Sequence, residues 1–154
     1  FWGNDLEEKK GDAFNLNQKI YKRFYQFKDF QCVIAVQDSL QDEIKEIISE
    51  IEIGVGTDMV KWNFIFGTPN EIEDLFDSLK SDVILSDKQS TSTVFILDRE
   101  SKLRGRDDDE DVGTLYGYNA SSVASLNNKM TDDVKVILAE YRLALKKNNS
   151  NRQK

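Results

Sequence analysis

The feature that most constrains the fold is a short apolar run, CVIAV at residues 32–36, flanked by two segments of helical periodicity. An apolar run of this length without polar alternation is typical of a strand that is covered on both faces. Before it, aromatic residues recur at roughly helical spacing over residues 13–28. After it, an isoleucine-rich stripe with acidic residues outside it extends over residues 40–51, with Ser39 as its expected N-cap. This order of helix, strand and helix predicts an α/β fold.

The second half of the chain continues this alternation. We expect a strand at residues 62–66 and then a helix that begins at Thr68, because Pro69 and Glu71 complete a capping-box start. A strand at residues 93–97 is expected to turn through residues 99–102 into a short partner strand around Leu103. Residues 107–118 are expected to form a loop, and Thr131 is the expected cap of the last helix.

This order of elements predicts a thioredoxin-like α/β fold. It comprises a central mixed sheet with helices on both faces, a C-terminal β-hairpin and a closing helix. We expect one domain over residues 1–148 and a frayed tail at residues 149–154.

Composition removes several classes of function. The chain has 28 acidic and 21 basic residues and no Lys/Arg-rich block, which argues against nucleic acid as a partner. It has no histidine and one cysteine, so we expect no cofactor, no zinc cluster and no two-cysteine redox motif. Cys32 opens an apolar strand without a cationic neighbour, which favours an inert buried thiol. Apolar runs fall far short of the ~20 residues that a membrane helix needs.

Several segments of the chain resemble the SCO/SenC family, thioredoxin-fold proteins that assist copper delivery to cytochrome oxidase. These segments are FNLN (14–17), IY (20–21), FKD (27–29), VIAVQD (33–38), WNFIFG (62–67), STVFILD (92–98), LRGR (103–106), YGYN (116–119) and the helix at 132–145. The resemblance covers most of the chain. It implies an extracytoplasmic bacterial setting, periplasmic or membrane-tethered, with any membrane anchor upstream of Phe1.

The copper ligands of the family have no counterpart here. Family members bind copper through two cysteines of a CxxxC motif and one distant histidine, and the matching positions fall near Glu7, Gly11 and Ser90. Carboxylates and hydroxyls hold Cu(I) poorly, and a lone thiol cannot resolve a mixed disulfide. The resemblance therefore implies the family fold without the family chemistry, and we expect no catalytic residues.

The family also carries a sheet strand ahead of its CxxxC motif, of which only Phe1 and Trp2 are present here. A sheet that lacks this strand exposes unpaired edges. We expect upstream residues to supply the strand, and the alternative is that another chain fills the gap.

An acidic run at residues 107–111 has two interpretations. Asp107, Asp109 and Asp111 alternate along it and are candidate ligands for Ca²⁺ or Mg²⁺, which bind hard oxygen atoms. The EF-hand template fails, because its glycine and glutamate positions hold Val112 and Tyr118. A solvated acidic loop is the favoured interpretation.

These observations predict a non-catalytic binding or assembly module in the cell envelope, with an unknown protein partner. The expected partner surface combines residues 3–11, residues 88–91 and the acidic loop at 107–111. One alternative is a divalent-cation-binding protein or enzyme that uses the acidic loop. Another is a thiol oxidoreductase or copper chaperone whose cysteine pair lies upstream of Phe1. The partner, the pathway and the oligomeric state stay open.

Overall fold

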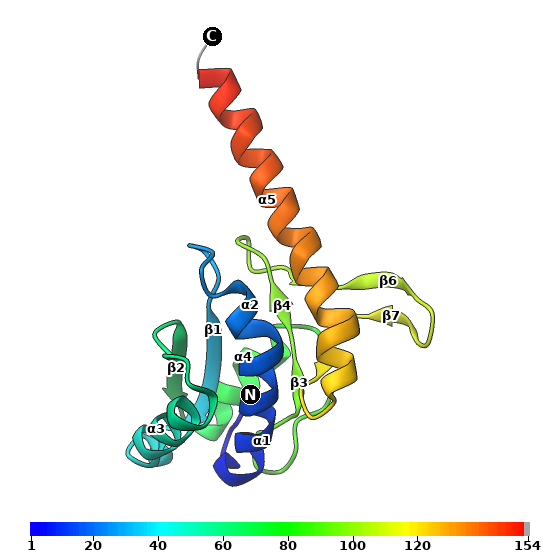
Figure 1. Ribbon diagram of the computed structural model, residues 1–154. Helices are drawn as coiled ribbons and strands as arrows, with labels where there is room; N and C mark the ends of the chain where they lie inside the picture. The colour runs from blue at the N-terminus through cyan, green and yellow to red at the C-terminus, as the bar shows by residue number, and fades with distance from the viewer. Residues whose placement is uncertain (153–154) are drawn as a thin grey trace.

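The computed structural model describes the backbone of residues 1–152 and the side chains of residues 1–147, and its fold is mixed α/β (Figure 1). The first helical segment is α1 (Leu6–Leu16), which continues through a π-helical turn, η1 (Asn17–Tyr21), into α2 (Lys22–Phe24). This segment begins at Leu6 rather than at residue 13. The difference arises because Lys9 and Asp12 are buried against each other as an ion pair, although their sequence suggests an exposed turn.

Two parallel strands lie beside this helical segment. β1 (Cys32–Gln37) and β2 (Trp62–Gly67) pair along their full length, from Cys32 opposite Trp62 to Gln37 opposite Gly67. Both predicted strands are thereby confirmed. On the other edge of β1, the first residues of the chain run parallel to it through a bridge between Gly3 and Val36.

The connection from β1 to β2 contains a short 3-10 helix, η2 (Asp38–Leu40), and α3 (Glu43–Val55). The prediction that Ser39 caps this helix was wrong. Ser39 lies inside η2, where Gln41 N–H donates to Asp38 C=O, and the residue before α3 is Asp42. At the other end α3 stops at Gly56, whose φ of 60° is a left-handed conformation that glycine adopts without strain.

The helix α4 (Pro69–Asp77) follows β2 and confirms the predicted capping box. The Thr68 hydroxyl accepts a hydrogen bond from Glu71 N–H, and the Glu71 carboxylate accepts one from Thr68 N–H at 2.8 Å. Phe76 on the buried face of α4 contacts the rings of Phe1 and Phe95, at centroid distances of 5.0 and 6.0 Å. These contacts place α4 over the start of the chain and over the segment around Phe95.

The remaining strands are short and pair antiparallel. The pairs are β3 (Thr93–Val94) with β8 (Tyr118–Asn119), β4 (Ile96–Leu97) with β5 (Leu103–Arg104), and β6 (Arg106–Asp109) with β7 (Gly113–Leu115). The β4–β5 pair confirms the predicted hairpin. The strands of the described residues form four two-stranded sheets, whereas one central sheet was predicted.

The predicted loop at residues 107–118 was wrong over the β6–β7 hairpin. Asp109 pairs with Gly113, whose φ of 75° allows the chain to reverse. Lys129 binds both Asp109 and Asp111, so the acidic run has a tertiary partner that neutralises part of its charge.

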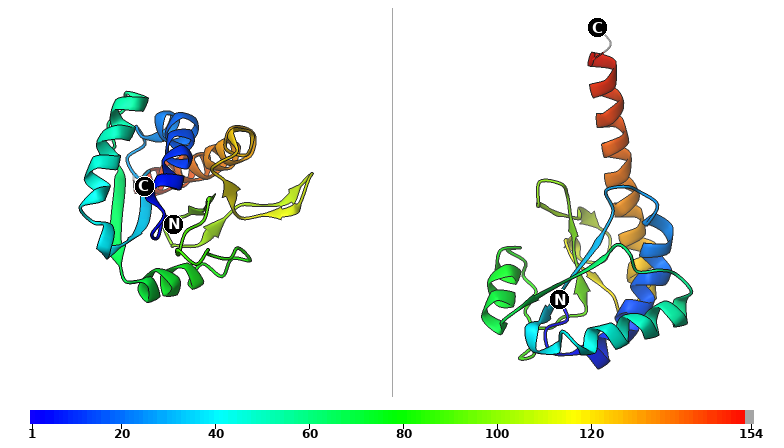
Figure 2. Two further views of the ribbon diagram at one scale, coloured as in Figure 1. Left: turned by 90° about the horizontal axis from the view of Figure 1, so that it is seen from below. Right: turned by 90° about the vertical axis from the view of Figure 1, so that its left-hand side faces the viewer.

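The chain ends in η3 (Ser125–Met130) and α5 (Thr131–Arg152), and α5 projects beyond the rest of the molecule (Figures 1 and 2). The prediction that Thr131 caps the last helix was wrong, because helical backbone already runs through η3. The Thr131 hydroxyl instead donates to the Leu126 carbonyl at 2.9 Å. α5 is helical to Arg152, across most of the predicted tail at 149–154, while residues 153–154 lie outside the described residues.

The core lies between the first helical segment, α3, β1–β2 and η3. Its fully buried side chains include Tyr21, Ile51, Tyr118 and Leu126. The aromatic face predicted for the first helix belongs to this core, as the sequence indicated. Within it, Tyr21 stacks on Tyr25 at a centroid distance of 5.6 Å.

Candidate functional site

Polar side chains at the start of α1 and in the loop before β3 form one connected cluster. Asn4 N–H donates to Lys88 C=O at 2.7 Å. The Lys88 ammonium lies 2.9 Å from Asp5 Oδ1, and the Ser90 hydroxyl donates to Asp5 Oδ2 at 3.3 Å. The structure thus brings residues 3–11 and 88–91 together, as the partner-surface prediction requires.

The carboxylate of Asp5 is the electrostatic centre of this cluster. Burial alone raises its pKa, but the hydrogen bond and charge of Lys88, with the Ser90 hydroxyl, hold the pKa below its usual value. Asp5 is therefore ionised at neutral pH, and its two oxygen atoms already have partners.

The three positions that match the family's copper ligands have separate surroundings. Ser90 is buried beside Asp5, whereas Glu7 and Gly11 are exposed on α1. Glu7 binds Lys10 at 2.9 Å, and Lys10 also binds Glu50 of α3 at 2.8 Å. None of these contacts provides the soft ligands that Cu(I) needs.

A shallow hollow of about 410 Å³ adjoins this cluster. Its charged lining is mainly carboxylate, with two lysines: Asp5, Glu7, Glu43, Glu46, Glu50, Lys10 and Lys88. A surface of this kind favours a partner that presents cationic or hydrogen-bond-donating groups.

The acidic hairpin does not join this surface. The β6–β7 hairpin projects from the side of the molecule that faces away from α3, apart from the start of α1 (Figures 1 and 2). The Lys129 ammonium lies 2.7 Å from Asp109 and 2.6 Å from Asp111, and Asp107 accepts a hydrogen bond from the Tyr116 hydroxyl at 2.8 Å. Within the part of the chain that the structure describes, no group of three or more His, Cys, Asp or Glu residues could hold a metal ion.

Cys32 begins β1 and is half-buried. Burial raises the pKa of its thiol to about 12, so the reactive thiolate is scarce at neutral pH. This local environment is the inert one that the sequence favoured.

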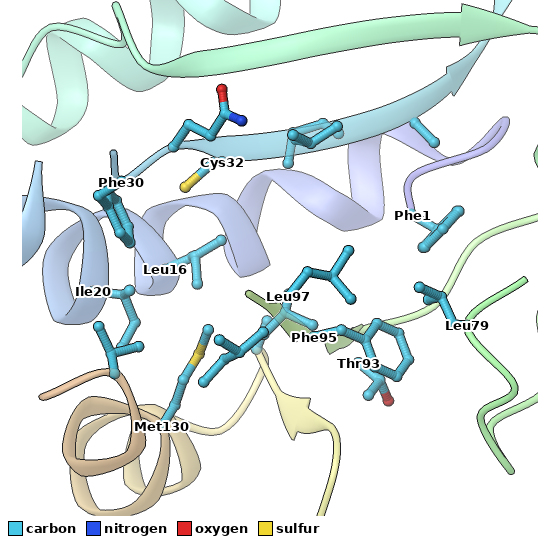
Figure 3. A pocket seen from close by; sticks show the side chains of 18 of the residues that line it. Phe1, Leu16, Ile20, Phe30, Cys32, Leu79, Thr93, Phe95, Leu97 and Met130 are labelled. Carbon is cyan, nitrogen blue, oxygen red and sulfur yellow. The ribbon is translucent and has the colours of Figure 1, made fainter. Parts of the chain in front are cut away.

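A second and larger hollow lies between β1 and residues 91–97 (Figure 3). Its volume is about 800 Å³, and its walls are mostly apolar side chains from α1, β1, α4, β3–β4 and η3–α5. Leu16, Ile20, Phe95, Leu97 and Met130 point into this space in Figure 3. We call it the interstrand groove.

Apolar side chains remain solvent-exposed along the interstrand groove. Val33 is 54% exposed, Leu97 48%, and Ile65 and Leu75 each 40%, and all four line the groove. Sequence reasoning anticipated unpaired strand edges but did not assign these four residues to an exposed surface. The available signal was the run at 32–36, which is apolar on both faces, so that any face left uncovered exposes apolar side chains.

In the described residues, no helix is both long enough and apolar enough to cross a bilayer. Comparison of the chain with protein-family models, with curated proteins and with solved structures finds no match.

Proposed function

We propose that this chain is a non-catalytic, thioredoxin-like domain of the SCO/SenC type that acts as a binding or assembly module. The order of elements supports the fold proposal. A strand-like start runs parallel to β1, a crossover helix leads to β2, and a β4–β5 hairpin precedes a closing helix. The resemblance of the sequence to the family carries the proposed extracytoplasmic setting.

The observation that carries the functional proposal is the internal pairing of the polar groups near the family's copper site. Asp5 is bound by Lys88 and Ser90, and Lys10 is shared between Glu7 and Glu50. The only thiol, Cys32, lies on β1 with a strongly raised pKa. Neither a Cu(I) site nor a thiol–disulfide centre can be assembled from these groups.

A Cu(I) titration against a chromophoric chelator tests the absence of copper chemistry. We expect no competitive uptake of Cu(I), and labelling of Cys32 only after denaturation. Tight one-to-one uptake that disappears in Cys32→Ser would overturn the proposal, because copper would then be held by that thiolate and other ligands.

Binding itself is tested at the hollow beside Asp5. A charge-reversal variant, Glu46→Lys, changes an exposed carboxylate of this lining and leaves the Asp5 cluster intact. Proteins that the parent chain captures in a pull-down should be lost with Glu46→Lys. They should be retained with Glu110→Lys, which reverses an exposed charge on the remote β6–β7 hairpin. Identical partner sets for both variants and the parent chain would contradict a partner surface at this hollow.

A further inference from the structure

We propose that residues 142–147 of α5, here called the basic arm, dock in the hollow beside Asp5 of a second copy of this chain. Copies then assemble head to tail. We call this hollow of about 410 Å³ the acidic hollow. The inference rests on the partner surface proposed above and names its partner, and its test is separate from the pull-down described there.

Charge is distributed unevenly along the chain. Residues 142–154 contain five basic side chains and no acidic one, whereas residues 1–141 contain 28 acidic and 16 basic side chains. The part of α5 that projects from the molecule therefore differs in sign from the rest of the chain (Figures 1 and 2). Surfaces of opposite sign on identical chains attract each other.

The basic arm carries its charges around an exposed leucine. Leu143 is 66% exposed, and the exposed Lys146 and Lys147 follow it by three and four positions. Side chains at these spacings lie on one face of a helix. Earlier in α5, Val134 is buried against the core, so the helix is anchored there and presents the arm beyond it. The arm thus offers a partner one apolar side chain flanked by two ammonium groups.

The acidic hollow has the complementary arrangement. Leu6 and Ile47 are buried and line it together with the half-buried Leu40, so its floor is apolar. Glu43 and Glu46 also line it and are exposed. Among the residues that the structure describes, neither carboxylate has an ion-pair partner. A cationic partner can therefore meet both without displacing an internal contact.

The two lysines of the lining do not repel a second cationic group strongly, because each is already bound to carboxylates. Lys10 lies 2.9 Å from Glu7 and 2.8 Å from Glu50, and Lys88 lies 2.9 Å from Asp5. The lining contains more carboxylates than lysines. Its excess negative charge is therefore located at the two remaining glutamates, which face the solvent.

Within one copy the basic arm and the acidic hollow cannot meet. The start of α1 and the helix α3 lie at one end of the molecule, and the arm projects from the other end (Figures 1 and 2). The contact therefore requires a second copy, and it joins two different surfaces. Such a heterologous contact leaves a free hollow on one copy and a free arm on the other, so assembly continues unless a ring closes.

Two charge-reversal variants test the contact. Glu43→Lys with Glu46→Lys reverses the hollow, and Lys146→Glu with Lys147→Glu reverses the arm. Sedimentation velocity at low salt measures self-association, and each variant should weaken it about tenfold or more relative to the parent chain. Raising the salt concentration to about 0.5 M should weaken association of the parent chain in the same way, because exposed charges are screened.

The matched control reverses two exposed carboxylates on the β6–β7 hairpin. Asp108→Lys with Glu110→Lys changes the net charge by the same amount as the hollow variant, and it should leave self-association unchanged. The interstrand groove contains none of the reversed positions, so any association through that groove is the same in every variant.

Mixing the two reversal variants identifies the contact itself. The hollow variant keeps its arm, and the arm variant keeps its hollow. An equimolar mixture should form a one-to-one complex and grow no further, whereas complexes of the parent chain grow with concentration. A chain that carries both reversals again has complementary charges and should recover self-association.

Three results overturn the inference. If neither reversal changes self-association, or if the double reversal does not recover it, the arm does not bind the hollow. If partners are lost in the Glu46→Lys pull-down while self-association is unaffected, the partner surface stands and its partner is a different cationic protein. If the arm binds vesicles of phosphatidylserine and phosphatidylcholine but the chain does not self-associate, the arm serves an anionic membrane surface instead.

Discussion

At the scale of single residues, two glycines in the expected partner surface have opposite requirements. Gly3 has a φ of +52°, and a Cβ added there would lie 2.0 Å from the Lys88 carbonyl oxygen. Around Gly11, within α1, an added Cβ meets nothing within 4 Å. Substitution by alanine at the two positions therefore distinguishes the cost of backbone strain at Gly3 from the gain in helix propensity at Gly11.

We expect Gly3→Ala to lower the free energy of unfolding by about 2–3 kcal/mol, because strain and a backbone clash combine. Gly11→Ala should raise it by about 0.5–1 kcal/mol, since alanine loses less conformational entropy in a helix. Urea denaturation of both variants measures the difference. Effects of the same sign would contradict the geometry at the start of the chain.

The thiol of Cys32 provides a pH-dependent prediction. Burial raises its pKa from 9.0 to about 12, so folding favours the neutral thiol. This contribution to stability is complete below pH 9, the unfolded pKa, and is lost as the pH rises toward 12. We expect Cys32→Ser to show a smaller loss of stability than the parent chain over this alkaline interval. If thermal melts show the same loss of stability for Cys32→Ser and for the parent chain across this pH interval, the loss does not come from Cys32.

At the scale of elements, a buried tyrosine ties β8 to the start of α5. The Tyr118 hydroxyl donates to Asp133 at 2.6 Å, and Arg106 binds the same carboxylate at 2.8 Å. Burial, followed by the hydrogen bond to Asp133, raises the pKa of Tyr118 well above its usual value. The neighbouring Tyr116 makes a similar contact to Asp107 at 2.8 Å, but on an exposed part of the hairpin.

We expect Tyr118→Phe to lower the free energy of unfolding by about 1–2 kcal/mol, because it removes a charge-assisted hydrogen bond from a buried position. Tyr116→Phe is the matched control, and it should change stability by less than about 0.5 kcal/mol. Denaturant melts of both variants give the comparison. Equal losses of unfolding free energy in the two variants would show that burial of the hydroxyl does not determine how much its hydrogen bond stabilises the fold.

The β6–β7 hairpin tests the cation-binding alternative. The ammonium of Lys129 lies between Asp109 and Asp111, in the place that a bound cation would take. We expect Ca²⁺ to leave the melting temperature of the parent chain unchanged, since a ligand raises it only by binding the folded state. Lys129→Met removes this internal cation and should gain a Ca²⁺-dependent rise. A Ca²⁺-dependent rise in the parent chain would instead support the metal-site interpretation.

Local patterns predicted the elements that are determined by local chemistry. The apolar run of β1 and the capping box at Thr68 occur where the sequence indicated them. The start of α1 was missed because Lys9 and Asp12 are buried only through their mutual contact. The β6–β7 hairpin was missed for a similar reason, because Lys129 neutralises carboxylates that are distant in sequence. The candidate sites also differ in how far the sequence could predict them. The resemblance placed Ser90 near the start of α1, while the interstrand groove depends on tertiary packing that no local pattern encodes.

At the scale of the whole molecule, the interstrand groove joins two features that promote association. It presents unpaired strand edges, and exposed apolar side chains such as Val33 and Leu97 line it. Natural proteins avoid this combination on exposed edges by placing charges or covering elements there. The chain should therefore self-associate through the groove.

Sedimentation velocity over a wide concentration range measures that association, and two substitutions locate it. Val33→Lys places a charge on the β1 edge of the groove, where the side chain is 54% exposed, so it should weaken association about tenfold without lowering the melting temperature. Val60→Lys is the matched control, because Val60 is 81% exposed and does not line the groove. Association that is equally sensitive to both substitutions would be a general effect of surface charge. A parent chain that stays monomeric at every concentration would show that these two edges do not promote association.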